Sequence, residues 1–265
     1  MSASPHDSGR GALPPVLRTP PGIFADQGKE AGAVTIRGDL WLGDAVLARG
    51  LDIHCRAGCW TCLMGPSGAG KSTLGRLVAG LPVKARLEGR VNVPFGRVAL
   101  MGQADQLLPW ASALDNVCIG ARLRGERADR DRARALLALV GLEGLEDRRP
   151  DELSGGQRQR VALARTLIEE AAVVVLDEPF SALDAGTRAA MQDLAARLLA
   201  GRVVILISHD PLEAARLADH AWLIGREGSR ALPLPGGTAP RPIDAPQVLA
   251  AQAALFQALS RPCAV

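Results

Sequence analysis

Apolar residues along this chain gather in short runs that alternate with longer amphipathic segments. Between positions 33 and 64 the runs are brief, rich in β-branched residues and separated by turn residues, which predicts an antiparallel sheet leading into a central strand. The expected strands are Val34–Arg37, Ala45–Leu47, Leu51–Cys55 and Trp60–Met64. Residues 1–32 are rich in Ser, Pro and Gly and show no periodicity, so we expect a disordered N-terminal tail there.

Further along, continuously apolar stretches alternate with helical ones. Strands are expected at Val173–Leu176 and Val203–Ile207. Helices are expected at about Lys71–Gly80, Gly155–Glu169, Ala185–Leu199 and Pro211–Leu217. Strands that are apolar on both faces and alternate with helices are typical of a parallel sheet covered on both sides. The pattern therefore predicts an α/β domain over residues 33–227.

Two segments depart from this alternation. Residues from about 104 to 152 show helical periodicity and predict an inserted α-helical subdomain. Its apolar face is formed by Leu136, Leu137, Leu139 and Val140. Residues 228–243 are rich in Pro and Gly, which predicts a linker. A last amphipathic helix is expected from Asp244, as its N-cap, to about Ser260, so that residues 228–265 form a linker and a C-terminal helix.

Composition argues against two kinds of direct contact. The net charge is only +3, aromatic residues make up 3% of the chain and there is no tyrosine, so we expect no nucleic-acid partner. The longest apolar runs, Ala171–Leu176 and Val203–Ile207, are far shorter than the roughly 20 residues of a membrane-spanning helix. No apolar core follows the first charges of the N-terminus, so we expect no signal peptide. Any membrane role must therefore come through a partner.

The cysteines allow two interpretations. An odd number without a secretion signal predicts reduced thiols; the five are Cys55, Cys59, Cys62, Cys118 and Cys263. Cys59 and Cys62 have the CxxC spacing, with His54 nearby, which leaves a metal or redox site open. However, residues i and i+3 of a strand point to opposite faces, so the two sulfurs would diverge. Packing in the core is therefore the interpretation that we favour.

A glycine-rich segment follows the strand at Trp60–Met64 and opens a helix. It reads Gly65-Pro66-Ser67-Gly68-Ala69-Gly70-Lys71-Ser72-Thr73. This matches GxxxxGK[ST] in the strand–loop–helix context that the motif requires. Glycines let backbone N–H groups close around phosphate oxygens, and the helix N-terminus adds partial positive charge. Lys71 is expected to reach the β- and γ-phosphates, and the Ser72 hydroxyl to bind Mg²⁺. An ordinary glycine-rich turn would not need this lysine and hydroxyl.

Two carboxylates end the apolar strand at Val173–Leu176. The C-terminal ends of strands in a parallel sheet line the ligand crevice, so Asp177 is expected to hold Mg²⁺. Glu178 lies one residue further on, where a carboxylate can accept a proton from an attacking water. A pair of solvated acids is the alternative, but Pro179 and the phosphate loop argue against it.

These features alone predict a P-loop ATPase or GTPase. A base-reading NKxD stretch, which a GTPase would need, is missing from the sequence. A second Ser-Gly-Gly turn, within Leu153–Gln157, opens another helix and offers another site for an anion. Since the chain already has one phosphate loop, this second anion site needs a reason.

Taken together, the motifs resemble those of the ABC ATPase family over about Val34 to Gly225. LSGGQRQR at Leu153–Arg160 resembles its signature, and Gln103 in MGQADQLLPW resembles its Q-loop glutamine. Ser181–Asp184 resembles its D-loop, and His209 resembles its switch histidine. The resemblance implies a P-loop RecA-like parallel sheet core, an antiparallel β subdomain and an inserted α-helical subdomain.

The resemblance also implies a head-to-tail homodimer, which gives the second anion site its reason. Each ATP would lie between the phosphate loop of one subunit and the signature of the other. Gln103 would sense Mg²⁺ and the attacking water, and His209 would position that water with Glu178. Asp184 would signal across the interface. The signature residues that would contact the partner's nucleotide are Ser154, Gly155, Gly156 and Gln157.

Two positions depart from the family pattern. An aromatic residue usually stacks on adenine about 24 residues before the phosphate loop. Trp41 is the only candidate, and Leu42 stands at the expected place, so Trp41 is either a ligand of adenine or a core residue. Gly102 precedes Gln103 where an aromatic residue is common, which would loosen that strand end.

The remaining features favour one branch of the family. The chain holds one nucleotide cassette, no fused membrane domain and a Leu-Leu-Pro-Trp stretch at Leu107–Trp110, which is either core or a docking surface for a permease. It resembles bacterial importers that receive solute from a periplasmic binding protein. The group in question serves nitrate, sulfonates or the hydroxymethylpyrimidine precursor of thiamine, and we favour the pyrimidine. Such a subunit would lie peripherally on the cytoplasmic face of the inner membrane. The alternative is a soluble ABC ATPase that regulates or assembles other proteins without a permease.

Overall fold

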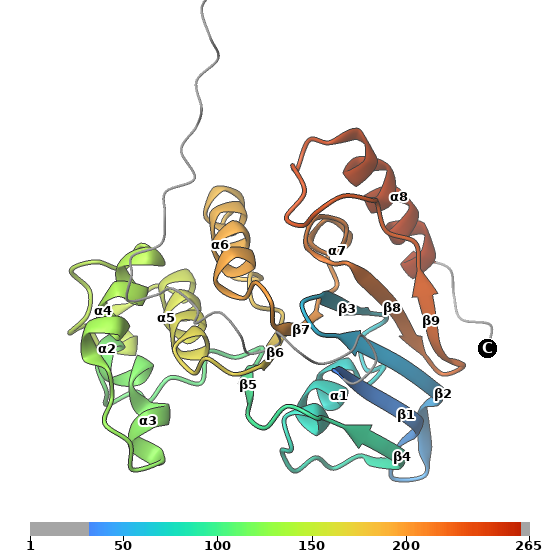
Figure 1. The fold of residues 1–265 in the computed structure, drawn as a ribbon, viewed down its shortest axis with the longest axis horizontal. Coiled ribbons are helices and arrows are strands. Elements are labelled where there is room, and N and C mark those ends of the chain that lie inside the picture. The colour runs from blue at the N-terminus through green and yellow to red at the C-terminus, as the bar shows by residue number, and fades with distance from the viewer. Residues whose placement is uncertain (1–31, 261–265) are drawn as a thin grey trace, which may run out of the picture.

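The computed structural model describes residues 32–260, and its central feature is a six-stranded sheet (Figure 1). The strand order is β5-β6-β7-β3-β8-β9, and all neighbours are parallel except β8 and β9. The strands are β3 (Trp60–Met64), β5 (Val98–Met101), β6 (Val173–Asp177), β7 (Val203–Ile207), β8 (His220–Gly225) and β9 (Gly228–Leu232). Every residue of β3, β6 and β7 is buried, as the apolar runs predict for strands covered on both faces.

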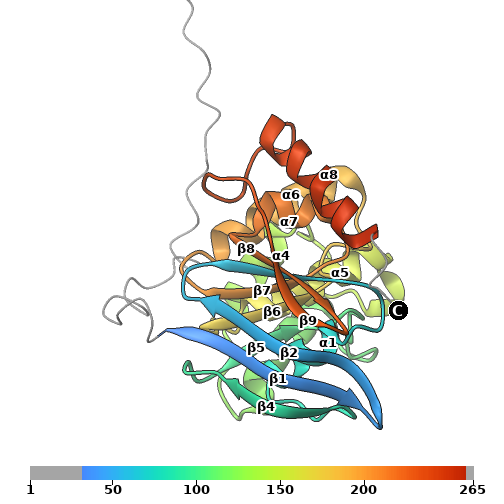
Figure 2. The ribbon, with the colours of Figure 1, turned by 90° about the vertical axis from the view of Figure 1, so that its right-hand side faces the viewer.

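Helices cover one face of this sheet and form the larger core. They are α5 (Gly155–Leu167), α6 (Ala185–Leu198), α7 (Pro211–Leu217) and α8 (Pro246–Ser260). Side chains of these helices pack with one face of β3, β6 and β7 in a single apolar cluster. Figure 2 shows the resulting layers, with α8 at the top and the strands beneath. The α/β fold predicted from the alternating pattern is therefore confirmed.

A three-stranded antiparallel sheet covers the opposite face. Its order is β2-β1-β4, formed by β1 (Ala33–Leu42), β2 (Ala45–Arg56) and β4 (Arg86–Asn92). The helix α1 (Lys71–Val78) lies with this sheet in a second apolar cluster that includes the other face of the central strands. The two sheets are joined where the amide of Asp52 donates to the Ser229 hydroxyl, at 2.9 Å. The antiparallel subdomain thus supports the strand that precedes the glycine-rich loop.

The helical insertion is built from short pieces rather than one long segment. It contains α2 (Ala113–Val117), α3 (Ile119–Leu123), α4 (Arg130–Leu139) and the 3-10 helix η2 (Pro150–Glu152). The prediction of helix from residue 104 is wrong for its first part, because 104–112 form a loop. Within α4, Leu136 and Leu137 are buried against α5, while Leu139 is only partly buried.

The C-terminal part differs from the prediction at two points. The first residues of the expected linker over 228–243 form β9, which pairs antiparallel with β8. The helix α8 begins at Pro246, and the amide of Leu249 donates to the carbonyl of Ala245, so Ala245 rather than Asp244 occupies the N-cap position. Residues 233–243 connect these elements, and the Arg241 guanidinium holds them to α7 through the carbonyls of Ala215 and Ala218.

The predicted N-terminal tail and Cys263 lie outside the described residues, except that Gly32 is buried and accepts a hydrogen bond from the amide of Ala57. Cys55 and Cys62 lie in the two different cores, which confirms packing for both, whereas Cys59 is only partly buried. Burial raises the pKa of the Cys55 thiol to about 12. Among residues 32–260, no cluster of three or more His, Cys, Asp or Glu side chains could hold a metal ion. Nor does any helix in that range combine the length and hydropathy of a membrane span.

Candidate functional site

The loop Gly65–Thr73 wraps between the end of β3 and the start of α1, as the motif predicts. Two of its glycines are required by close contacts. A Cβ at Gly65 would lie 2.3 Å from the carbonyl oxygen of Ile224, and one at Gly70 would lie 2.5 Å from the Leu40 side chain. Both residues also have positive φ, at 144° and 88°. Only glycine fits such positions without strain, so β8 and β1 together set the curvature of the loop.

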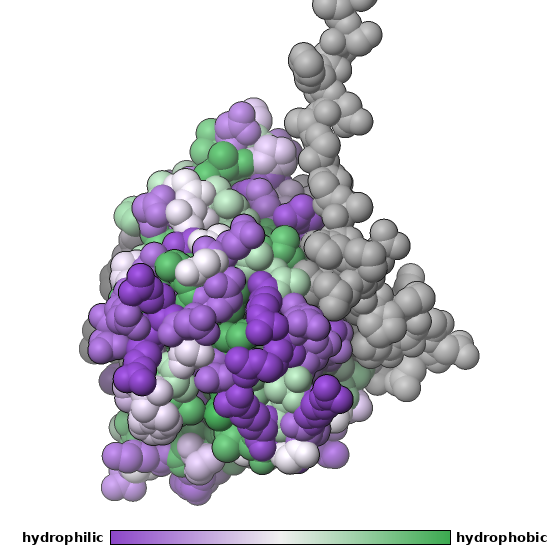
Figure 3. Space-filling model, turned by 90° about the vertical axis from the view of Figure 1, so that its left-hand side faces the viewer, coloured by the Kyte–Doolittle hydropathy of each residue, from purple (hydrophilic) through white to green (hydrophobic). Residues whose placement is uncertain are grey.

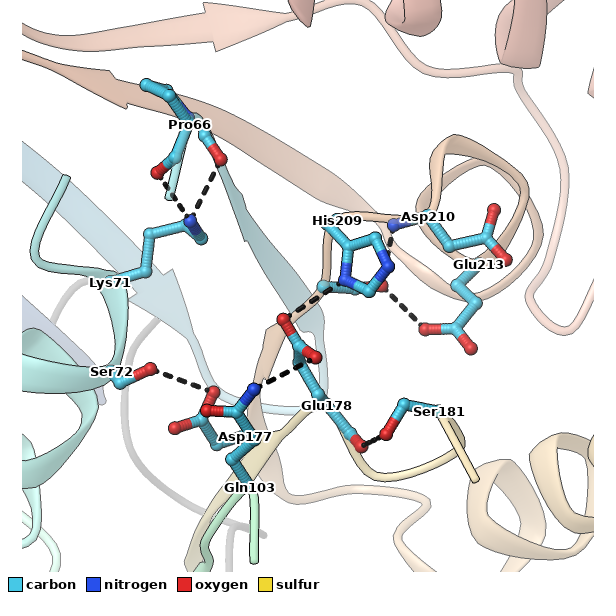
Figure 4. Close-up of polar contacts among 12 residues, drawn as sticks. Pro66, Lys71, Ser72, Gln103, Asp177, Glu178, Ser181, His209, Asp210 and Glu213 are labelled. Carbon is cyan, nitrogen blue, oxygen red and sulfur yellow. Dashed lines mark hydrogen bonds and ion pairs between the residues drawn. The ribbon is translucent and has the colours of Figure 1, made fainter. Parts of the chain in front are cut away.

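The first turn of α1 is open to an anion. Gly70 occupies its N-cap without a side-chain cap, and the first turn contains no acidic residue. The Lys71 ammonium instead bends back and donates to the carbonyls of Gly65 and Pro66, at 2.8 and 2.9 Å (Figure 4). Burial lowers the pKa of Lys71, while the nearby carboxylates of Glu178 and Asp177 oppose that effect. Uncapped amides with a lysine beside them suit phosphate oxygens.

Ser72 and Asp177 meet across the gap between α1 and the end of β6. The Ser72 hydroxyl donates to Oδ1 of Asp177 at 3.1 Å. Asp177 is only 4% exposed, and burial raises the pKa of its carboxyl although the Ser72 hydrogen bond lowers it. A hydroxyl and a buried carboxylate are oxygen ligands of the kind that Mg²⁺ prefers. The pair therefore fits a magnesium ion bound beside the phosphate loop.

The Glu178 carboxylate is the meeting point of the other predicted catalytic residues (Figure 4). Its Oε1 lies 3.0 Å from Nδ1 of His209, and its Oε2 accepts from Nε2 of Gln103 at 3.4 Å. Gln103 follows β5 and His209 follows β7, so the carboxyl ends of neighbouring strands bring the three together. A carboxylate that keeps these partners and remains partly exposed can accept a proton from water.

The backbone at Glu178 is strained. Its φ is 51°, a left-handed conformation that costs a non-glycine residue about 1–2 kcal/mol. The amide of Glu178 donates to the carbonyl of Ile207 at 2.9 Å, and the carbonyl of Glu178 accepts from the Ser181 hydroxyl at 3.1 Å. Strain of this kind persists where surrounding contacts hold it, and it is concentrated at functional sites.

Sequence reasoning missed the residues that hold the His209 loop. The Ser208 hydroxyl donates to the Glu213 carboxylate at 2.6 Å and accepts from the amide of Asp210 at 3.0 Å. Glu213 is 5% exposed, and burial raises the pKa of its carboxyl. An acid in the first turn of a helix usually faces solvent, so nothing in the sequence indicated its burial. Sequence reasoning also missed Gln159 on α5, whose side chain donates a hydrogen bond to the carbonyl of Glu178.

The signature turn is preformed. Ser154 caps α5, because its hydroxyl accepts from the amide of Gln157 at 3.2 Å while the Gln157 side chain accepts from the amide of Ser154 at 2.8 Å. This capping box leaves the remaining first-turn amides free, and that turn contains no acidic residue. Gly155 and Gly156 follow directly, and a Cβ at Gly156 would lie 3.3 Å from the carbonyl oxygen of Ala182.

Asp184 caps α6 in the same way, and its carboxylate accepts from the amide of Thr187 at 3.0 Å. This backbone hydrogen bond lowers the pKa of Asp184. Asp184 and Ser154 are both exposed. Within residues 32–260, no hydrogen bond or ion pair joins either residue to the phosphate loop. One subunit thus brings together Lys71, Ser72, Gln103, Asp177, Glu178 and His209, but not the signature turn at Ser154.

Trp41 lies outside this group. Its ring has the guanidinium groups of Arg49 and Arg86 beside it, at 5.8 and 5.9 Å from the ring centroid. Leu40, one residue earlier, is buried in the core beneath the phosphate loop, and the pairing of β1 with β2 shifts register between Leu40 and Trp41. The stacking of Trp41 on adenine stays a prediction, and nothing in this arrangement favours it.

Comparisons with known proteins point to one family. The sequence profile described as ABC transporter matches residues 48–181. The chain is 41% identical to an uncharacterized ABC transporter ATP-binding protein of Haemophilus influenzae, over 76% of this chain and 87% of that protein. It is 46% identical to the aliphatic sulfonates import ATP-binding protein SsuB 1 of Rhodococcus jostii, over 70% of this chain and 76% of that protein.

Solved structures agree with these sequence matches. The fold is similar to the ATP-binding cassette MJ0796 in a dimeric post-hydrolysis state bound to ADP and Pi, with a TM-score of 0.66 and 25% identity. The match covers 77% of this chain and 100% of that chain. Another dimeric structure of the same cassette gives a TM-score of 0.68 at the same coverage. The predicted parallel sheet with its antiparallel and helical additions is thus the fold of a known nucleotide-binding cassette.

Proposed function

We propose, from the premise that the chain belongs to the ABC transporter family, that it is the ATPase subunit of a bacterial importer and drives solute uptake through a separate permease. ATP binding and hydrolysis follow from the family. The observation that carries the site assignment is the Glu178 carboxylate, which contacts both Gln103 and His209 beside the buried Ser72–Asp177 pair.

The hydrolytic step follows from these positions. Lys71 would exchange the loop carbonyls for the β- and γ-phosphates, and the free amides of α1 would bind the same oxygens. Water attacks the γ-phosphorus, its proton passes to the Glu178 carboxylate, and the bond from phosphorus to the ADP oxygen breaks. Gln103 and His209 hold the carboxylate in line with that water. Mg²⁺, held by Ser72 and Asp177, would neutralise charge on the phosphate oxygens.

We further propose that the working form is a head-to-tail dimer. Within residues 32–260 of one subunit, no hydrogen bond or ion pair joins Ser154 to the phosphate loop, yet the free amides of the signature turn and its lack of acids suit an anion. A second copy supplies such an anion in the γ-phosphate on its own phosphate loop. Asp184, exposed at the N-terminus of α6, would then face the partner across the interface. The dimeric cassettes among the similar structures support this arrangement.

The permease contact is proposed at the loop after Gln103. Trp110 is 71% exposed, whereas Leu107 of the same stretch is buried. The loop is rigid, because the Asn116 carboxamide accepts from the amide of Leu108 and donates to the carbonyls of Leu108 and Ala111. The loop leads into α2 of the helical insertion, and the face of the molecule seen from that side is mostly hydrophilic with smaller apolar areas (Figure 3). A fixed loop that presents an exposed indole suits a short helix from a membrane partner.

The transported solute is proposed to be an aliphatic sulfonate. Relatives named for aliphatic sulfonate import match at 44–46% identity, which favours this class over the hydroxymethylpyrimidine expected from the sequence. A periplasmic binding protein would deliver the solute to the permease. The subunit would lie peripherally on the cytoplasmic face of the inner membrane, where the permease holds it.

The test of the site is Glu178→Gln. Loss of the proton acceptor should lower the ATPase rate about 10²–10⁴-fold, while the phosphate contacts and the affinity for ATP remain. Glu227→Gln, which changes an exposed carboxylate in the β8–β9 turn, is the matched control and should hydrolyse ATP normally. ATP turnover and equilibrium nucleotide binding are measured on the purified full chain. A near-normal rate for Glu178→Gln would refute the assignment.

A further inference from the structure

A buried carboxamide on α5 reaches the loop that carries Glu178. Gln159 is 6% exposed and lies five residues after Ser154, on the helix that the signature turn opens. Its Nε2 donates to the carbonyl of Glu178 at 3.1 Å, and its Oε1 accepts from the amide of Ala182 at 2.9 Å. We infer that Gln159 is a positioning residue, which holds the proposed base in place and ties it to the signature helix; the inference rests on the proposed role of Glu178.

The contact matters because of the conformation that it holds. Glu178 has φ 51°, a region that an L-residue rarely adopts, and this turn aims its carboxylate between Gln103 and His209. Its amide is held by Ile207, and its carbonyl by Gln159 and Ser181. Of these groups, only Gln159 comes from outside the strand ends and the loop itself. Removing it frees the strained turn to relax and to carry the carboxylate away.

The Oε1 atom of the Gln159 carboxamide holds the segment that leads to Asp184. Oε1 of Gln159 accepts a hydrogen bond from the amide of Ala182. The carbonyl oxygen of Ala182 also lies close to Gly156, at 3.3 Å from the place that a Cβ of this residue would take. The Nε2 of Gln159 reaches the Ser181 hydroxyl as well, at 3.4 Å. The start of α5 and the loop from Glu178 to Asp184 therefore pack as one unit. A shift of α5 when Ser154 engages a partner's nucleotide would pass directly to the Glu178 backbone.

Both ends of this contact require a side chain that donates and accepts at once, as a carboxamide does. Glutamine offers one donor pair and one acceptor on a single planar group, whereas an ionised carboxylate can only accept. Methionine has the same reach but neither capacity, and it would leave the carbonyl of Glu178 and the amide of Ala182 short of a buried partner. A residue that serves packing alone would be replaced by methionine without an effect on catalysis.

The first experiment compares Gln159→Met with Thr166→Val in the full chain. Thr166 lies on the same helix and is also buried. Its replacement by valine removes one hydrogen bond, which the Thr166 hydroxyl donates to the carbonyl of Ala162. Gln159→Met should lower kcat about 100-fold, the effect of a displacement of about 1 Å in a catalytic group, with KM and Kd for ATP unchanged. Thr166→Val should leave kcat unchanged. Equal kcat values for Gln159→Met and the wild type would overturn the inference.

A pH profile of Gln159→Glu supplies a readout that packing would not change. Burial raises the pKa of a carboxyl group, so this side chain gains a proton as the pH falls toward 6. The protonated acid both donates and accepts, as glutamine does, whereas the carboxylate cannot donate to the Glu178 carbonyl. The ratio of the variant's kcat to that of the wild type should therefore rise as the pH falls. A ratio that stays flat over pH 6–9 would contradict the inference.

Glu178→Gln separates failure of the inference from failure of the proposed function. If Glu178→Gln keeps its ATPase activity, the site assignment itself is wrong. If it loses activity while Gln159→Met retains it, only the role of Gln159 is wrong. In the double variant, Gln159→Met should cause no further loss, because a positioning residue acts through the group that it positions. An additional 100-fold loss in that background would show an effect independent of Glu178.

Discussion

Folding buries the Asp177 carboxylate even when no Mg²⁺ is bound to it. Among residues 32–260, only the Ser72 hydroxyl donates a hydrogen bond to this carboxylate, and burial raises its pKa above the ordinary value of 3.8. The folded protein therefore binds this proton more tightly than the unfolded chain does. Stability is accordingly lost as the pH rises from 3.8 through the raised pKa. The proposed role of Asp177 as an Mg²⁺ ligand would account for this cost in stability.

The stability that the buried Asp177 carboxylate costs can be measured with Asp177→Asn. The amide oxygen still accepts from Ser72 but carries no buried charge, so the nucleotide-free variant should melt about 2–4 °C higher at pH 7, as expected for ~1 kcal/mol in a domain of this size. The gain should shrink as the pH falls toward the pKa of Asp177, and Mg²⁺-dependent ATPase activity should be lost. Calorimetry at pH 4.5 and pH 7 measures the two melting temperatures, and an ATPase assay with Mg²⁺ measures the loss of activity. Asp184→Asn, at an exposed carboxyl with a lowered pKa, is the control and should show no gain.

The site residues that could be predicted from the sequence differ in their position in the fold from those that could not. Lys71, Ser72, Asp177 and Glu178 lie at strand ends or helix starts, and such positions leave a local pattern in the chain. Gln159 lies within the signature match, but its contacts could not be predicted, because its partners lie 19 and 23 residues away and only packing brings them together. The same holds for burial of Glu213, which depends on how α7 packs on the sheet.

At the scale of elements, the fully buried strands β3, β6 and β7 were predictable, whereas β4, β5, β8 and β9 were not expected from the sequence. β4 is mostly exposed and contains three charged residues, so its alternation is too weak to indicate a strand. β1 was expected to stop before Gly38. It continues because Gly38 pairs with Gly89, and a Cβ on Gly38 would lie 2.2 Å from the carbonyl oxygen of Glu88. A glycine that usually ends a strand here permits two strands to approach closely.

The docking loop supports a prediction at the same scale. Trp110→Glu should fold normally and bind ATP, because the indole is exposed and the loop is held through Asn116. It should lose at least tenfold in affinity for the permease, as truncation of an exposed aromatic anchor at an interface costs about 2 kcal/mol, and solute uptake should stop. Binding is measured by co-purification of the chain with multi-spanning membrane proteins from the cells that produce it.

Leu123→Glu supplies the control for this experiment. Leu123 is 80% exposed in α3 of the same subdomain but lies outside the loop, so its replacement should leave permease binding intact. Unfolding of Trp110→Glu, or unchanged binding and uptake, would assign Trp110 to a structural role. Failure to find any permease would favour a soluble ATPase that regulates other proteins.

At the scale of the whole molecule, the fold brings the residues around the phosphate loop together and leaves the signature turn at Ser154 apart from them. The carboxyl ends of β3, β5, β6 and β7 converge on Lys71 and Glu178, whereas Ser154 opens α5, which packs beside α2 and α4 of the helical insertion (Figure 1). The α/β class and the motif order were predictable from the chain. The separation of the two anion sites was not, because it depends on how the helical subdomain packs against the sheet. This separation is what a second copy would bridge.

The most direct test of this account mixes two inactive chains. Lys71→Ala destroys the phosphate loop and Ser154→Arg destroys the signature, so each homodimer lacks every intact site. A mixed dimer contains one intact site, formed by the loop of the Ser154→Arg chain and the signature of the Lys71→Ala chain. Mixing at equal concentrations should restore up to about a quarter of the wild-type ATPase rate, because half of the dimers are mixed and each holds one of two sites. No recovery on mixing, with both chains folded and able to dimerise, would contradict a site shared between subunits.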